Sequence, residues 1–105
     1  MLDIKSWLSE LNLPVEETAF IKPPNLPYLV YLDVITSSGD DQCYTVLFTH
    51  DLNIELYQAK RNPTLENDVE RLFRDKGFEY QKNVEWLVNE KMFMTMYSLN
   101  FIEKE

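Results

Sequence analysis

The sequence predicts a single α+β domain over residues 1–105, with a mostly antiparallel sheet of about four to five strands and two amphipathic helices packed on one face. A chain of 105 residues has room for one hydrophobic core and seldom for two. Its hydrophobic content of 45% and aromatic content of 13% are typical of a packed globule. The apolar residues change from a helical period to alternation and back, in the order helix, strands, helix, hairpin.

The first predicted element is a short amphipathic helix over residues 3–12. Its apolar residues recur at i, i+3, i+4 and i+7, as Ile4, Trp7, Leu8 and Leu11. Asp3 is suited to cap the first turn, and Pro14 opposes continuation of the helix. Residues 14–27 hold four of the five prolines, so we expect an anchored arm on the surface.

The central part of the sequence predicts strands. Residues 28–35 are rich in aromatic and β-branched side chains, which favour a strand covered on both faces. A polar loop follows over 36–42. The pattern then continues through 43–57 either as two strands or as one long strand bent near His50 and Asp51, and the sequence leaves both alternatives open.

The clearest element is a helix over 63–76. Asn62 is a good cap, Pro63 is suited to the first helical position, and Gly77 ends the helix in a left-handed conformation. The apolar stripe consists of Leu65, Val69, Leu72 and Phe73. The residues predicted to face water are Glu66, Asn67, Glu70, Arg71 and Arg74.

The rest of the chain predicts a hairpin. Residues 78–82 begin an extended segment, and 84–88 continue it after a bulge or form a short helical turn. Residues 89–91 form a turn, and 92–102 alternate as a long last strand.

Composition excludes several classes of function. The net charge of −8 disfavours a protein that binds the phosphate backbone of nucleic acids. One cysteine and one histidine allow neither an internal disulfide nor a zinc cluster, so we expect no metal and no cofactor. The sequence shows no signal peptide and no apolar run of the roughly 20 residues that span a membrane, which predicts a soluble intracellular protein without a membrane partner.

The residues that could carry chemistry favour structural roles. His50 and Asp51 are adjacent, and adjacent strand residues point to opposite faces, so a catalytic dyad is disfavoured. Cys43 lies near the carboxylates of Asp40 and Asp41, which oppose the thiolate form. No Gly-rich phosphate loop, nucleophile elbow or zinc motif occurs. The sequence therefore predicts an interaction protein and no enzymatic activity.

Two regions are candidate interfaces. The polar loop presents Asp40 and Asp41 to a partner or to a lumen. The last strand is apolar on both sides, with Phe93 and Tyr97 as candidate contacts opposite a row of three methionines, Met92, Met94 and Met96. Either a second subunit or tube covers the sheet face opposite the helices, or residues 14–27 fold back over that face.

The chain resembles the small tail terminators, or tail-completion proteins, that join heads to tails in long-tailed phages of Gram-positive bacteria. The resemblance spans nearly the full chain. The segments that carry it are KPPNLPYLVY at 22–31, IELY at 54–57, the helix 63–76 ending at Gly77, FEYQK at 78–82 and NEKMFMTMY at 89–97.

The resemblance implies a structural virion protein. Such a protein forms a ring, commonly hexameric, that caps the finished tail tube and docks the head connector. The implied partners are further copies of the chain, the tube protein and the connector protein, and DNA passes through the lumen without specific binding. The implied location is the head–tail interface of the virion, and the host cytoplasm during assembly. An acidic ring would repel passing DNA.

A second class of function also fits the charge. An acidic phage-encoded inhibitor could present carboxylates in place of DNA phosphates to a basic host protein. Such a decoy needs its acids gathered on one outer face. In this sequence the acids are spread along the chain and interleaved with Arg71, Arg74 and Lys76 on the main helix, which favours an ordinary solvated surface.

Overall fold

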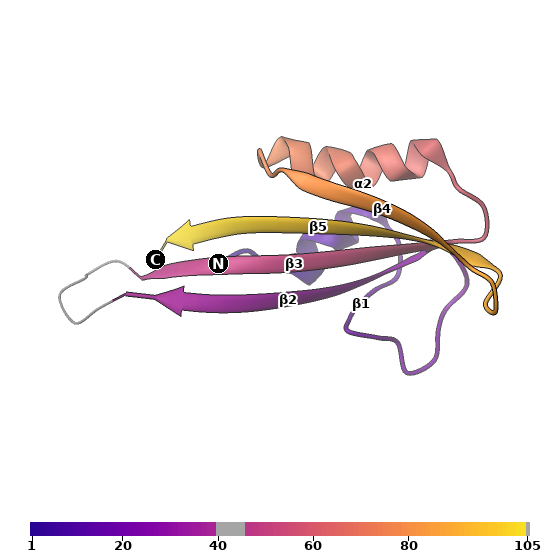
Figure 1. Cartoon of the computed structure of the whole chain (residues 1–105), viewed down its shortest axis with the longest axis horizontal. Helices are drawn as coiled ribbons and strands as arrows, with labels where there is room; N and C mark the ends of the chain where they lie inside the picture. The colour runs from indigo at the N-terminus through magenta and orange to yellow at the C-terminus, as the bar shows by residue number, and fades with distance from the viewer. Residues whose placement is uncertain (40–45, 105) are drawn as a thin grey trace.

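The computed structural model describes residues 1–39 and 46–104, and it confirms the predicted α+β class (Figure 1). Five strands form one mixed sheet in the order β1-β2-β3-β5-β4. The strands are β1 Val15–Glu17, β2 Tyr28–Ser38, β3 Leu47–Gln58, β4 Tyr80–Leu87 and β5 Met92–Lys104. The helices are α1 Ile4–Leu8, the short 3-10 helix η1 Ser9–Leu11, and α2 Pro63–Asp75.

The first predicted helix is present as α1 followed by η1. The Asp3 carboxylate accepts a hydrogen bond from the Ser6 amide at 3.2 Å, which caps the first turn as predicted. Asn12 adopts a left-handed conformation with φ of 59° and ends the helical segment before Pro14. The buried side chains of α1 are Ile4, Trp7 and Leu8.

The proline-rich arm contains a strand that the sequence did not predict. β1 pairs in parallel with β2, with Val15 opposite Leu29. The Leu29 amide donates to the Pro14 carbonyl at 2.9 Å, and the Thr18 amide donates to the Tyr31 carbonyl at 2.8 Å. A strand of three residues is too short to show alternation in the sequence, because its position depends on this contact with β2.

β2 and β3 form the long antiparallel pair at the centre of the sheet. β3 is one continuous strand over the described part of 43–57, which decides between two strands and one long strand. Its register with β2 runs from Tyr28 opposite Tyr57 to Ser38 opposite Leu47. β2 is buried on both faces from Tyr28 to Tyr31 and is mostly exposed beyond that point, apart from the partly buried Asp33, so its two faces are covered in part.

Helix α2 has the predicted ends. The Asn62 side chain accepts hydrogen bonds from the amides of Thr64 at 3.1 Å and Leu65 at 3.3 Å. Gly77 has φ of +72°, and its amide donates to the Arg74 carbonyl at 3.0 Å. Only a residue without a Cβ adopts this conformation at no steric cost, which explains why the helix ends at this glycine.

One face of α2 differs from the prediction. Glu66 and Glu70 were predicted to face water, but Glu66 is only 3% exposed and the Glu70 side chain only 16%. Both carboxylates point toward the sheet, where they meet Lys82 and further donors from neighbouring strands. Helical periodicity explains this placement, because Glu66 and Glu70 lie one turn apart on the same side as Val69 and Phe73.

β4 and β5 form the predicted hairpin, and β4 continues from Tyr80 to Leu87 without a helical turn. The register runs from Tyr80 opposite Leu99 to Leu87 opposite Met92. The Lys91 amide closes the turn by donating to the Leu87 carbonyl at 2.8 Å.

The hydrophobic core lies between the sheet and both helices. The Trp7 ring of α1 packs at 5.8 Å from the Phe73 ring of α2, so the two helices cover the same face, as predicted. Phe73 also contacts the Tyr97 ring of β5 at 5.2 Å. The sheet residues of this core are Val15, Leu29, Tyr31, Leu52, Ile54, Leu56, Tyr97, Leu99 and Phe101.

Candidate functional site

The sheet face turned away from α1 and α2 is the candidate interaction surface, and we call it the open face. Side chains on a strand alternate between the two faces, so the strand register assigns every residue to a face. The open face has Val30, Leu32 and Val34 on β2, Asp51, Asn53 and Glu55 on β3, Met94, Met96, Ser98, Asn100 and Ile102 on β5, and Gln81, Asn83 and Glu85 on β4.

One end of the open face is an apolar hollow of about 360 Å³. The arm after β1 forms one wall, where the Phe20 ring packs against the Tyr28 ring at 5.4 Å. The other residues around it include Val30, Tyr57, Leu87 and Met92. The arm therefore covers part of this face, while Ile21 at its tip is fully exposed.

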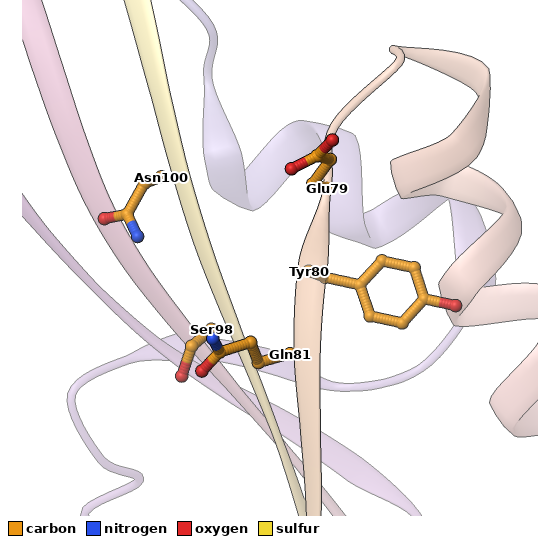
Figure 2. Close-up of a pocket in the computed structure, with 5 residues that line it drawn as sticks. All are labelled: Glu79, Tyr80, Gln81, Ser98 and Asn100. Carbon is orange, nitrogen blue, oxygen red and sulfur yellow. The ribbon is translucent and has the colours of Figure 1, made fainter.

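The middle of the open face is polar. The Ser98 hydroxyl donates to the Asn53 side chain at 2.9 Å, across β5 and β3. A smaller hollow of about 220 Å³ lies at the start of β4. Figure 2 shows the residues that line it, with Glu79 and Gln81 from β4 and the segment before it, and Ser98 and Asn100 from β5. Tyr80, which also lines this hollow, turns its ring toward α2. The Ser98 hydroxyl in this hollow is engaged in its hydrogen bond to Asn53.

Both edges of the sheet have unpaired stretches within the described part of the chain. β1 covers only residues 29–31 of β2, so the remainder of β2, residues 32–38, has no neighbour on that side. Along this stretch Leu32 is 47% exposed and Ile35 is 43% exposed. The opposite edge is β4, where Trp86 is 46% exposed. Exposed apolar edges of this length are typical of strands that pair with another chain.

The structure separates the residues predicted as interface candidates. Asp40, Asp41 and Cys43 lie outside the described residues. Tyr97 is fully buried under α2, so the expectation that it contacts a partner is wrong for the folded domain. The physical reason is the strand alternation, which places Tyr97 on the helix side and the methionines on the open face. Phe93 is partly buried, and its ring packs against that of Trp86 at 4.7 Å.

His50 has a structural environment. Its Nδ1 atom lies 2.7 Å from Oδ2 of Asp33, and its ring stacks on Phe101 with centroids 4.3 Å apart. Asp51 points to the open face, so the two adjacent residues face opposite ways, as the sequence indicated. These contacts hold the fully buried imidazole in place.

The same cluster attaches the start of the chain to the last strand. The Glu103 carboxylate accepts the Leu2 amide at 3.0 and 3.2 Å. Oε1 of Glu103 also lies 3.0 Å from Nε2 of His50, without the alignment of a hydrogen bond. Glu103 therefore ties the segment before α1 to β5, and we call this contact the Leu2–Glu103 clamp.

The strongest electrostatic feature lies between α2 and the sheet, and sequence reasoning missed it. Glu66 contacts Arg61 and Lys82 at 2.8 Å each, and Gln58 donates to it at 3.2 Å. Burial by itself raises the pKa of Glu66, but hydrogen bonds from Arg61, Lys82 and Gln58 outweigh it and lower the pKa from 4.5 to about 2. The available signal was the spacing of Glu66 and Glu70 within the apolar stripe.

Glu70 extends this network to the sheet tyrosines. It accepts hydrogen bonds from the hydroxyls of Tyr80 at 2.6 Å and Tyr97 at 3.0 Å, and Lys82 lies 3.0 Å away. Burial raises the pKa of Glu70, while these donors lower it and prevail. Charges are therefore matched inside the fold, and the network supports α2 on the sheet.

Comparison with known proteins gives a likeness in fold. No protein-family model matches the chain, and no curated protein sequence matches it. The fold is similar to a chain in the virion of a native gene transfer agent particle. The likeness has a TM-score of 0.58 at 11% sequence identity, and it covers 89% of this chain and 81% of the other. At this identity the two chains share a fold.

Two further properties concern the described residues alone. Within residues 1–39 and 46–104, no cluster of three histidine, cysteine, aspartate or glutamate side chains is arranged to hold a metal ion. None of the helices in these ranges has the length and apolar character that crossing a membrane requires.

Proposed function

We propose that this chain is a structural, non-enzymatic component of a phage-like virion, and that it acts as a tail terminator. In this role copies of the chain form a ring, hexameric in its finished state, on the end of the tail tube. The ring stops addition of tube protein and presents a docking surface to the head connector. The observation that carries the proposal is the likeness in fold, over 89% of the chain, to a chain of a gene transfer agent virion.

The distribution of polar groups supports a role in assembly. His50, Glu66 and Glu70 are largely buried ionisable groups, and each has partners from neighbouring elements that stabilise the fold. The groups left for partners are the open face and the two unpaired sheet edges. A protein whose free surface consists of sheet edges and apolar side chains is suited to permanent contacts.

The polar middle of the open face is suited to a lumen through which DNA passes. Asp51, Glu55 and Glu85 all lie on this face, and it has no arginine in its described part. Six copies would carry six times the chain's net charge of −8. Carboxylates facing the lumen would repel DNA phosphates and allow the duplex to slide.

The structure gives less support to the acidic inhibitor. A decoy needs a continuous row of free carboxylates on one surface. Glu66, Glu70 and Glu103 are instead engaged by Lys82, by tyrosine hydroxyls and by the Leu2 amide. These three acids therefore do not contribute to an outer acidic face.

Deleting the gene from its phage tests the proposed function. We expect filled heads together with unattached tails or abnormally long tubes, seen by negative-stain electron microscopy, and a loss of infectious titre. Supplying the wild-type gene in trans should restore joined particles. Virions of normal tail length and normal titre after deletion would contradict the proposal.

A further inference from the structure

We propose that copies of this chain join edge to edge, so that the sheet of one copy continues into the next. The unpaired stretch of β2, residues 32–38, pairs in antiparallel fashion with β4 of a second copy. This inference deepens the proposed function, on which its choice of a second copy as the partner rests. Four features of the fold support it: strand direction, backbone phase, length, and the stagger between the two edges.

Strand direction is the first feature. β2 is antiparallel to β3, β3 to β5, and β5 to β4. Three reversals make β4 run opposite to β2. A second copy that is placed beside the first in the same orientation, with its helices on the same face, therefore brings its β2 antiparallel to β4.

Backbone phase is the second feature. The Leu29 amide and the Tyr31 carbonyl point outward to the β1 segment, so the odd-numbered residues of β2 direct their polar groups to that edge. The Leu87 carbonyl points toward β5, where it accepts a hydrogen bond from the Lys91 amide. Because backbone polar groups alternate in direction along a strand, the even-numbered residues of β4 direct their amides and carbonyls outward. In both strands these outward residues carry side chains on the helix side, and the two edges are complementary.

Length is the third feature. Pairing Ile35 with Val84 sets residues 32–38 against seven of the eight residues of β4 and forms about six new backbone hydrogen bonds. Ile35 and Val84 are 43% and 39% exposed, and the contact covers both. The pairing starts at Leu32, where β1 stops, and Leu32 then lies opposite Leu87, where β4 enters its turn.

The stagger between the edges is the fourth feature, and it favours a closed ring. Leu32 of β2 pairs with Asn53 of β3, which pairs with Ser98 of β5. Leu87 of β4 pairs with Met92 of β5, six residues from Ser98 along the same strand. Each added copy is therefore displaced from its neighbour by about 20 Å along the strand direction and by about 19 Å, the width of four strands, across the sheet. This step inclines the strands by about 45° to the ring axis, close to the roughly 35–45° of closed barrels.

Disulfide trapping tests the pairing directly. In a Cys43→Ser background, Thr36→Cys and Asn83→Cys lie opposite each other in the proposed register, on the open face. Such a pair has Cα atoms about 4.5 Å apart, within disulfide range. Within one copy the two positions lie about 14 Å apart across the sheet, with β3 and β5 between them, and about 20 Å apart along the strands, so only a contact between copies can join them.

We expect oxidation of this variant to give a ladder of covalent multimers beyond the dimer on a denaturing gel. The samples are the concentrated purified protein and purified tails. The matched control is Thr49→Cys with Asn83→Cys, because Thr49 lies opposite Thr36 on the same face but one strand inside the edge. A ladder from the first pair alone, in either sample, supports the inference. No ladder in both samples, or equal ladders from the two pairs, overturns it.

A second variant separates assembly from folding. Ile35→Pro removes an amide that points outward and makes no bond to β3, so we expect an unfolding midpoint within about 5 °C of the wild type. Introduced with the two cysteines, it should reduce the ladder at least tenfold. A folded proline variant that keeps the full ladder overturns the pairing. If gene deletion abolishes joined particles but the cysteine variant gives no ladder, the proposed function stands and the edge pairing is wrong. If the cysteine variant gives a ladder but deletion leaves normal virions, the edge pairing stands and the proposed function is wrong.

Discussion

Replacing Glu66 with glutamine tests whether the buried network holds α2 on the sheet. Glutamine keeps the shape of the side chain but removes the charge that faces Lys82 and Arg61, each 2.8 Å away. Lys82 keeps Glu70 as a partner at 3.0 Å, so it is not stranded by the change. The substitution therefore measures the charge of Glu66 more than the packing around it.

The magnitude follows from the pKa of Glu66. Because folding lowers this pKa from 4.5 to about 2, the ionised form stabilises the folded state by about 3 kcal/mol. The stabilisation is fully present above the unfolded pKa of 4.5, and it is lost as the pH falls toward 2. We therefore expect the free energy of unfolding of Glu66→Gln at pH 7 to be up to about 3 kcal/mol below that of the wild type. On acidification the stability of the variant should fall much less than that of the wild type.

Urea unfolding followed by circular dichroism at pH 7, 4 and 2.5 provides the assay. A loss of this size lowers the urea midpoint at pH 7 by about 1–3 M. Asp68→Asn is the matched control, because Asp68 lies on the exposed side of α2, 3.7 Å from Arg71, and its loss should change stability by less than about 1 kcal/mol. An unchanged midpoint for Glu66→Gln at pH 7, or parallel acid profiles for variant and wild type, would refute the reasoning.

Substitutions at four other positions probe the packing and the ends of elements. Phe73→Ala should lower the free energy of unfolding by about 3–5 kcal/mol, because Phe73 is fully buried. Leu72→Ala should lower it clearly less, because Leu72 is only partly buried. The urea midpoints of the two variants provide the comparison, and equal losses would contradict the packing described above. Asn62→Ala should cost about 1 kcal/mol by removing the helix cap, and Asn62→Asp at neutral pH should restore it in thermal unfolding. His50→Ala should speed proteolysis of the segment before α1, because His50 contacts Glu103, which holds Leu2. An unchanged digestion rate would show that His50 does not support the Leu2–Glu103 clamp.

Local patterns in the sequence predicted the elements that local interactions determine. The second helix was predicted with its cap at Asn62 and its end at Gly77, because both depend on neighbouring residues. The alternation of 92–102 correctly divided the last strand into two faces. It did not show which face meets the helices, because that depends on contacts with α2, and Tyr97 was therefore assigned to the wrong environment.

The features that sequence reasoning missed depend on residues far apart in the chain. β1 is a strand only because β2 offers an edge at Leu29. Glu66 was taken as a water-facing residue because its charge suggested solvent, and its partner Lys82 lies sixteen positions later on another element. An acidic side chain inside an apolar stripe indicates a buried ion pair, although the sequence does not name the partner.

The Leu2–Glu103 clamp holds the first and last described segments side by side, which makes the chain suited to circular permutation. The Leu2 amide and the Glu103 carboxylate are 3.0 Å apart, so a linker of a few residues could join the two ends without straining the sheet. New ends could then be opened at Asn89, in the exposed turn between β4 and β5. Such a circular permutant would carry a fluorescent or affinity label at this turn and leave β5 continuous with α1 through the linker.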